Sequence, residues 1–73
     1  MERIRMQDFD SKSVKSGGYD ARSRTLRLRF AGGHLYDYRN VPRKVFNELL
    51  RASSKGQFVN WHVKPFYPYR RLG

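Results

Sequence analysis

Residues 33–42 (GHLYDYRNVP) constrain the fold of this chain more than any other segment. Residues 34–39 read as a β-strand in which Tyr36 and Tyr38, two positions apart, share one face. The strand ends at Asn40, and Pro42 suits the first turn of a helix, where its missing N–H has no intrahelical partner. The sequence therefore predicts a strand that runs directly into a helix.

A second strand precedes this one. Residues 25–30 (TLRLRF) alternate between polar and apolar side chains, which predicts a strand with one buried face. Residues 31–33 are expected to form a tight hairpin. Residues 21–24 predict a polar turn, and residues 14–21 are weakly extended. Gly17 and Gly18 interrupt that segment, which predicts a bulge or the close approach of another backbone.

The length of the hairpin loop decides where the two tyrosines point. With a two-residue loop they share a face with the arginines of the preceding strand and form an exposed platform for unpaired bases. With a three-residue loop and a glycine bulge they join Leu26 and Leu28 in the core. The first register buries Asp37 beside these leucines, which is costly, whereas the second sets it beside arginines, where a cross-strand pair contributes roughly 0.2–1 kcal/mol. The second register is therefore favoured.

Two helices follow the strands. In residues 42–53 the apolar and polar side chains fall on opposite arcs at about 100° per residue, which predicts an amphipathic helix laid on a sheet. Ser54 and Gln57 have the spacing of a capping box, which predicts a second helix over residues 55–64 that ends before Pro65. We therefore predict an α+β fold with a small antiparallel β-meander of two to three strands, followed by two helices packed on one face. The expected core comprises Tyr19, Leu26, Leu28, Phe30, Tyr36, Tyr38, Val45, Phe46, Leu49, Leu50, Phe58, Val59 and Val63.

The chain has 73 residues, which is enough for one small domain. We expect a flexible arm over residues 1–12, the folded domain over residues 13–67 and a basic, aromatic tail over residues 68–73. The absence of cysteine excludes disulfides and thiolate metal sites. Residues 1–10 resemble neither a signal peptide nor a membrane span, so a cytoplasmic location without membrane contact is expected.

Positive charge dominates the composition, with 16 Lys+Arg against 6 Asp+Glu and a formal net charge of +10. So strong a field on a small body favours polyanions such as nucleic acid as partners. The candidate nucleic-acid-binding residues lie on the predicted open sheet face, on the outer arc of the first helix and after the second helix: Arg27, Arg29, Arg39, Arg43, Lys44, Arg51, Lys64, Arg70 and Arg71. Because these residues lie on more than one side, they also fit a surface that is merely solvated.

Two further features have alternative readings. Residues 67–71 interleave aromatic and cationic side chains, as in a nucleic-acid-binding segment or as in an aromatic strap that closes a small core. Trp61 is read mainly as covering the rim of the core, with a stacking or interface residue as the alternative.

Catalysis has little support in the sequence. His34 and His62, with a lysine, are the candidate acid–base pair. His34 adjoins the hairpin turn, and His62 falls in the apolar arc of the second helix, where a packing role is expected. The acidic residues lack paired or metal-ligand spacing, so we expect no catalytic residue, no metal and no cofactor.

Taken in order, these motifs resemble the KTSC domain, found at the carboxyl end of some lysyl-tRNA synthetases and as stand-alone short bacterial proteins. The resemblance spans roughly residues 11–67, and the chain departs from an apolar preference at Gly17. It is carried by Gly18, Tyr19, Asp20, residues 26–30, Gly33, Tyr36, Asp37, Tyr38, Val41, Pro42, Ala52, Ser53, Gly56, Phe58, Asn60 and an aromatic residue at Phe66 or Tyr67.

The resemblance implies no catalytic residue, and the synthetase context implies RNA binding. We therefore predict a non-catalytic nucleic-acid-binding module, with RNA as the expected polyanion, that acts through its basic surface. The alternative is a protein-interaction module that docks on an acidic protein partner, for which residues 14–21 would offer an exposed sheet edge.

Overall fold

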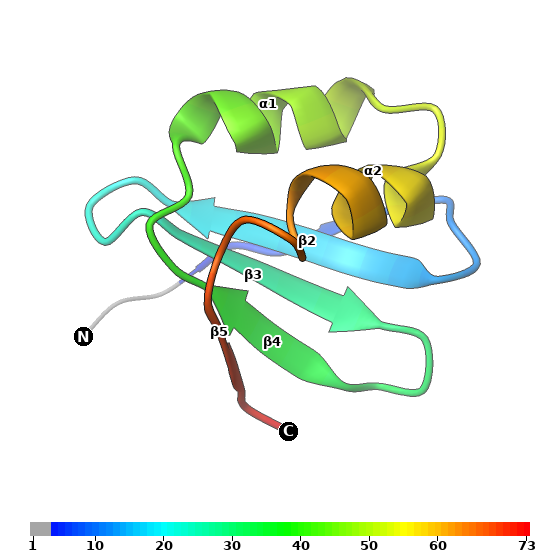
Figure 1. The fold of residues 1–73 in the computed structure, drawn as a ribbon. Coiled ribbons are helices and arrows are strands. Elements are labelled where there is room, and N and C mark those ends of the chain that lie inside the picture. The colour runs from blue at the N-terminus through cyan, green and yellow to red at the C-terminus, as the bar shows by residue number, and fades with distance from the viewer. Residues whose placement is uncertain (1–3) are drawn as a thin grey trace.

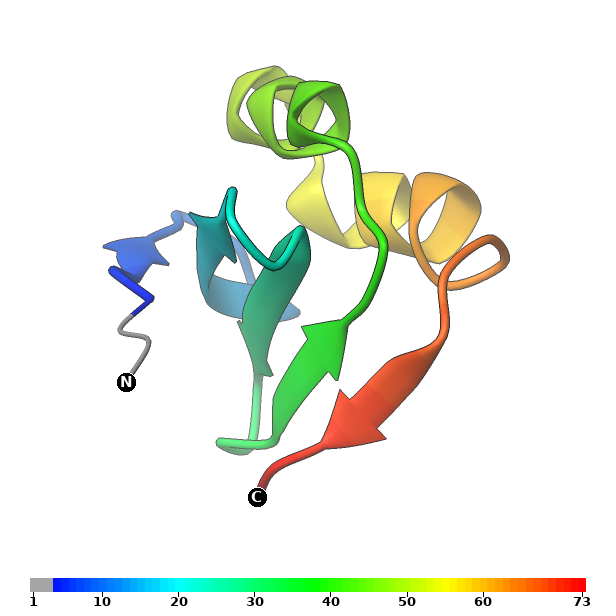
Figure 2. The same cartoon turned by 90° about the vertical axis from the view of Figure 1, so that its left-hand side faces the viewer.

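The computed structural model describes residues 4–73 and forms a five-stranded antiparallel sheet in which the strands follow one another in chain order (Figure 1). Both helices lie on the same face of the sheet and leave the other face uncovered by helix, as the perpendicular view shows (Figure 2). The elements are β1 (Gln7–Asp8), β2 (Val14–Asp20), β3 (Thr25–Phe30), β4 (Leu35–Tyr38), α1 (Arg43–Arg51), α2 (Lys55–His62) and β5 (Tyr69–Arg71).

The α+β class and the two helices are confirmed, but the expected two to three strands are too few. β1 lies within the predicted arm and pairs with β2, and β5 lies within the predicted tail and pairs with β4. These edge strands have two and three residues. Strands so short show no alternation that a sequence pattern can reveal. Residues 1–3 of the predicted arm lie outside the described residues.

The hairpin between β3 and β4 has the three-residue loop that the sequence favoured. The Phe30 N–H donates to the His34 carbonyl at 2.8 Å, and the Gly33 N–H donates to the Phe30 carbonyl at 2.9 Å. Gly32 and Gly33 both have positive φ, 92° and 90°, a region that glycine enters without a side-chain clash. The two glycines therefore set the length of the loop.

This loop places the tyrosines of β4 on the helix side of the sheet. Leu26 pairs with Tyr38 and Leu28 pairs with Tyr36, so the favoured register is confirmed. The Tyr38 side chain is 1% exposed, and Tyr36 is half-buried against the core. The exposed tyrosine platform of the two-residue loop does not form.

Gly17 and Gly18 of β2 have no side chains, so other residues pack closely against β2 on both faces of the sheet. At Gly18, on the open face, a Cβ atom would collide with the main-chain carbonyl of Arg5. At Gly17, on the helix side, a Cβ would lie 2.9 Å from the Phe9 ring. The predicted close approach is therefore confirmed, and Phe9 supplies the apolar group that Gly17 lacks. The register shift of β2 lies just before the pair, between Val14 and Ser16.

The core fills the space between the sheet and the helices. Five expected core residues are only partly buried: Tyr19, Phe30, Tyr36, Leu50 and Phe58. Val14 and Val41 were not expected there, because one lies in a weak strand pattern and the other in a turn. The buried apolar side chains are Val14, Leu26, Leu28, Tyr38, Val41, Val45, Phe46, Leu49, Val59 and Val63.

The helices are slightly shorter than the predicted residues 42–53 and 55–64. The Gln57 N–H donates to the Ser54 hydroxyl oxygen at 3.3 Å, which confirms the cap of α2. The Lys55 ammonium donates to the carbonyls of Leu50 and Ala52 at 3.1 and 2.6 Å. Lys55 thereby satisfies carbonyls at the end of α1 that have no intrahelical partner.

Candidate nucleic-acid interface

The open face of the sheet gathers arginines from β3, from β5 and from the residue that follows β4. Arg27 on β3, Asp37 on β4 and Arg70 on β5 are register partners, so their side chains form one row across the sheet. Arg29 and Arg39 lie two positions from members of this row along the chain and share its face. The Arg39 N–H donates to the Pro68 carbonyl at 2.9 Å, which extends the pairing beyond β4. We call Arg27, Arg29, Arg39 and Arg70 the open-face cluster.

The open-face cluster keeps a strong excess of positive charge. The Arg27 guanidinium holds Asp37 at both carboxylate oxygens, with Nε–Oδ1 at 2.7 Å and Nη2–Oδ2 at 2.9 Å. Arg29, Arg39 and Arg70 are exposed, and Arg29 also donates to the Gly33 carbonyl at 3.2 Å. Over β3, β4 and β5 the face thus carries four arginines and one aspartate. Such a surface can hold several phosphates at once.

The sequence anticipated most of this cluster. Arg27, Arg29 and Arg39 were expected on the face away from the helices, and the structure places them there. Arg70 was assigned to a tail, because residues 69–71 are too few to read as a strand. Its pairing opposite Asp37 comes from tertiary contacts alone.

The cations of α1 lie on the other side of the molecule. Arg43, Lys44 and Arg51 are exposed, and the buried side of α1 faces the sheet. The Arg43 guanidinium carbon lies 5.8 Å from the centre of the Tyr19 ring, a cation–π contact. Because α1 lies on the helix side of the sheet (Figure 2), these three residues do not join the open-face cluster.

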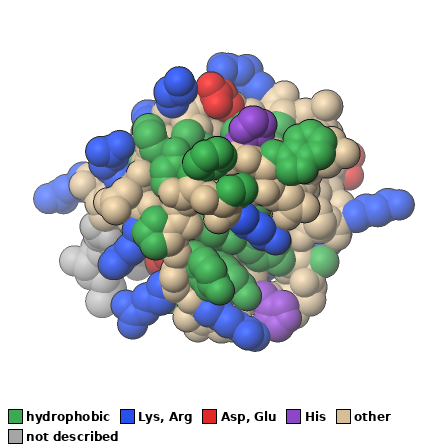
Figure 3. Space-filling view, in the orientation of Figure 1, with side chains coloured by type: hydrophobic (Ala, Val, Ile, Leu, Met, Phe, Trp, Pro, Cys, Tyr) green, Lys and Arg blue, Asp and Glu red, His purple; other side chains and the backbone are tan. Residues whose placement is uncertain are grey.

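The remaining two candidates, Lys64 and Arg71, lie on the helix side near β4 and β5. The Lys64 ammonium is 5.2 Å from the centre of the Phe30 ring, and an Arg71 Nη2 lies 2.8 Å from His34 Nδ1. Arg71 pairs with Tyr36 and therefore faces the helix side, opposite to Arg70. Figure 3 shows this side of the molecule, where hydrophobic patches alternate with Lys and Arg side chains.

Tyr38 lies beneath this region and resists ionisation. Burial of its phenol, together with the neighbouring phenols of Tyr36 and Tyr69, raises the pKa of Tyr38 to about 12. Tyr38 therefore stays neutral at physiological pH, and its ring packs as an apolar side chain whose hydroxyl is the one polar group.

Two expectations about aromatic side chains are wrong. Trp61 is 63% exposed and does not cover the rim of the core. His62 is exposed rather than packed in the core, and its ring lies 5.0 Å from Phe58. The apolar arc of α2 is narrower than the sequence pattern indicated, because Val59 is the one helical residue of α2 that is fully buried. Trp61 as an interface residue stays a prediction.

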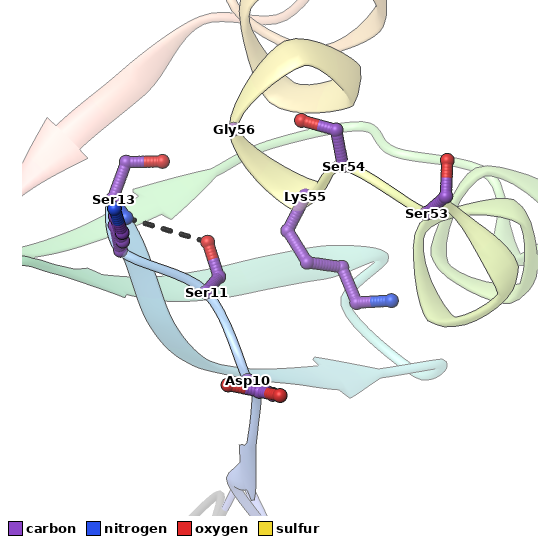
Figure 4. Close-up of a pocket in the computed structure, with 8 residues that line it drawn as sticks. Asp10, Ser11, Ser13, Ser53, Ser54, Lys55 and Gly56 are labelled. Carbon is purple, nitrogen blue, oxygen red and sulfur yellow. Dashed lines mark hydrogen bonds between the residues drawn. The ribbon is translucent and has the colours of Figure 1, made fainter.

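A shallow polar hollow of about 270 Å³ lies between the β1–β2 turn and the α1–α2 turn (Figure 4). Lys55 extends along it towards the end of α1, where its ammonium is already bonded to carbonyls. The Ser11 hydroxyl accepts from the N–H groups of Ser13 and Val14 at 3.3 and 3.2 Å. The polar groups of Ser11 and Lys55 are therefore used in hydrogen bonds that stabilise the two turns.

The described residues hold no cluster of three His, Cys, Asp or Glu side chains that could bind a metal ion. Residues 4–73 also contain no helix that is long and apolar enough to span a membrane.

The expected sheet edge at residues 14–21 is wrong, because β2 pairs with β1 on one side and β3 on the other.

Comparison with known proteins identifies the family to which this chain belongs. The family model described as KTSC domain matches residues 10–67. A short protein of Tsukamurella paurometabola is 48% identical over 60 residues, which cover 82% of this chain and 90% of that protein. A lysine–tRNA ligase of Nostoc sp. is 37% identical over 59 residues, which cover 81% of this chain but 10% of the ligase. The crystal structure of a KTSC domain protein from Yersinia pestis has a TM-score of 0.91 and 30% identity, covering 97% of this chain and all of that one. The chain belongs to the KTSC domain family.

Proposed function

We propose that this protein is a non-catalytic nucleic-acid-binding module that holds RNA through the open-face cluster. The observation that carries the proposal is the row of Arg27, Asp37 and Arg70, flanked by Arg29 and Arg39, on a sheet face that no helix covers. The relatives among lysine–tRNA ligases support RNA as the polyanion and the cytoplasm as the place of action.

The chemistry of the cluster suits phosphate better than base recognition. Guanidinium groups bind phosphate oxygens through two parallel N–H donors, and arginine keeps its charge at every physiological pH. Binding to phosphates releases condensed counterions, so affinity falls steeply as salt rises. The proposal therefore implies weak sequence preference and strong salt dependence.

A charge-matched pair of variants tests the location of the site. Arg39→Gln/Arg70→Gln removes two charges from the open face, and Lys44→Gln/Arg51→Gln removes two from α1. We expect the first variant to weaken binding of a fluorescent single-stranded RNA about tenfold or more in an anisotropy titration. Its log–log salt slope should become shallower by about 1.4, since each phosphate contact contributes about 0.7 on single strands. The α1 variant should change both quantities far less.

Two results would reject the proposal. One is the absence of RNA binding by the unchanged protein at low salt. The other is an equal loss in both double variants, which indicates a diffuse charge effect without a site. If RNA does not bind and a pull-down recovers an acidic protein after nuclease treatment, the module docks on protein instead.

A further inference from the structure

Tyr69 lies at the exposed end of a stack of aromatic rings. Its ring centre is 5.2 Å from that of Tyr36 with 29° between the planes, and 5.9 Å from that of Tyr38. Tyr36 in turn meets Phe30 edge-on at 5.4 Å. Tyr38 is buried, whereas Tyr69 remains 62% exposed. The stack therefore runs from the core to the sheet edge and leaves much of its last ring in solvent.

The backbone around Tyr69 is held in place before any ligand arrives. At one end of β5 the Arg39 N–H donates to the Pro68 carbonyl at 2.9 Å, and at the other end the Leu72 N–H donates to the Leu35 carbonyl at 2.7 Å, so both bonds tie β5 to the β4 segment. An aromatic ring fixed on a paired strand loses little conformational entropy when a flat ligand stacks on it. Tyr69 is thus a pre-organised stacking surface.

Arginines flank this ring on both faces of the sheet. Arg70 faces the open side opposite Asp37, whereas Arg71 faces the helix side opposite Tyr36. Arg71 is positioned by its contact with His34 Nδ1 at 2.8 Å. One short edge strand therefore presents an exposed ring with a guanidinium on each side of the sheet.

We propose that β5 binds an unpaired nucleotide of single-stranded RNA, with the base stacked on Tyr69 and the adjoining phosphates on Arg70 and Arg71. This inference rests on the proposed RNA binding and names the form of RNA. Bases inside a duplex are already stacked and cannot reach a side-chain ring, whereas unpaired bases can. The flanking cations favour a polyanion over an apolar protein segment as the occupant of this edge.

The test compares single-stranded and duplex RNA on variants of one ring. The probes are a labelled unstructured RNA of about twelve nucleotides, within the range that small binding folds contact, and its annealed duplex. Tyr69→Leu should weaken single-strand binding about ten- to a hundredfold and change duplex binding less than about threefold. Tyr69→Phe should keep single-strand affinity within about threefold, because its ring still stacks.

Phe66→Leu is the matched control, because Phe66 is an aromatic residue of similar exposure whose ring contacts Tyr67 outside this stack. It should leave single-strand affinity unchanged. Circular dichroism of each variant verifies the fold, and Tyr69→Phe preserves the ring even if the leucine variant unfolds.

The failures of the two proposals differ. If the unchanged protein binds RNA but Tyr69→Leu keeps its single-strand affinity, or loses single-strand and duplex affinity equally, the stacking site is rejected and phosphate binding stands. If Tyr69→Phe weakens single-strand binding as much as Tyr69→Leu, the stacking site is likewise rejected. If the unchanged protein binds neither RNA at low salt, both proposals are rejected.

Discussion

Arg27 and Asp37 face each other across β3 and β4 and form a two-point ion pair, with Nε–Oδ1 at 2.7 Å and Nη2–Oδ2 at 2.9 Å. The pair lies on the open face, which is the side that the hairpin register assigns to both residues. It also sets a carboxylate in the middle of the open-face cluster. Asp37 therefore supports the register and reduces the positive field of the proposed site.

Asp37→Asn should strengthen RNA binding while it weakens the fold slightly. Loss of the negative charge removes repulsion of phosphates, and we expect affinity at low salt to rise about two- to fivefold. A partly exposed ion pair contributes little, so the free energy of unfolding should fall by about 0.5–1 kcal/mol. Anisotropy titration and urea unfolding measure the two effects. Asp10→Asn, the same charge change at the β1–β2 turn, serves as the control, and an equal gain there would contradict the prediction.

Gly18→Ala should destabilise the protein. The added methyl group would collide with the Arg5 carbonyl, and a main-chain atom cannot move aside as a flexible side chain can. We expect the free energy of unfolding to fall by about 1–3 kcal/mol, as for other overpacked sites. Gly73→Ala, where a Cβ meets no described atom within 4 Å, is the control. Equal urea midpoints for the two variants would show that the Arg5 segment does not cross Gly18 in solution.

Lys55→Met should destabilise the connection between the helices. The change keeps much of the side-chain length but removes the ammonium that donates to the carbonyls of Leu50 and Ala52. We expect a loss of roughly 1–2 kcal/mol in thermal or urea unfolding, since a charged donor is removed from partly buried acceptors. Lys44→Met removes the same charge from the exposed side of α1 and should cost far less. Similar losses in both variants would mean that net charge, and not the cap, sets the effect.

Stability should decline between about pH 10 and pH 12 because of Tyr38. Its pKa is raised to about 12 in the folded protein from 10.0, so the unfolded chain releases the phenol proton first as pH rises. The contribution is fully present below pH 10 and decreases by about 2–3 kcal/mol as pH approaches 12. Tyr38→Phe should remove this part of the decline in urea unfolding across that range. A variant that declines as steeply as the unchanged protein would contradict the assignment.

The local sequence pattern and the free-energy cost of burying a charge were sufficient to predict the central part of the fold. The alternation of residues 25–30 and the glycines of the loop predicted the hairpin, and the expense of burying Asp37 chose its register. The amphipathic arc of α1 predicted its buried side, with Val45, Phe46 and Leu49 facing inward. Each of these features depends on residues close together in the chain.

The candidate site was only partly predictable, because it depends on residues that lie far apart in the chain. β1 and β5 are too short to show a period, so their pairing depends on partners that the sequence separates by several elements. Trp61 likewise turned out exposed because the burial of α2 depends on how the helix is seated on the sheet.

The sequence by itself determined the β3–β4 hairpin, the inward side of Tyr38 and the two helices, because periodicity and desolvation act locally. Tertiary structure alone decided that Arg70 joins Arg27, Arg29 and Arg39 on one face and that Tyr69 stacks on Tyr36. The reason is that β5 pairs with β4 only after α1 and α2 have brought the chain back to the sheet, and side-chain direction follows that pairing.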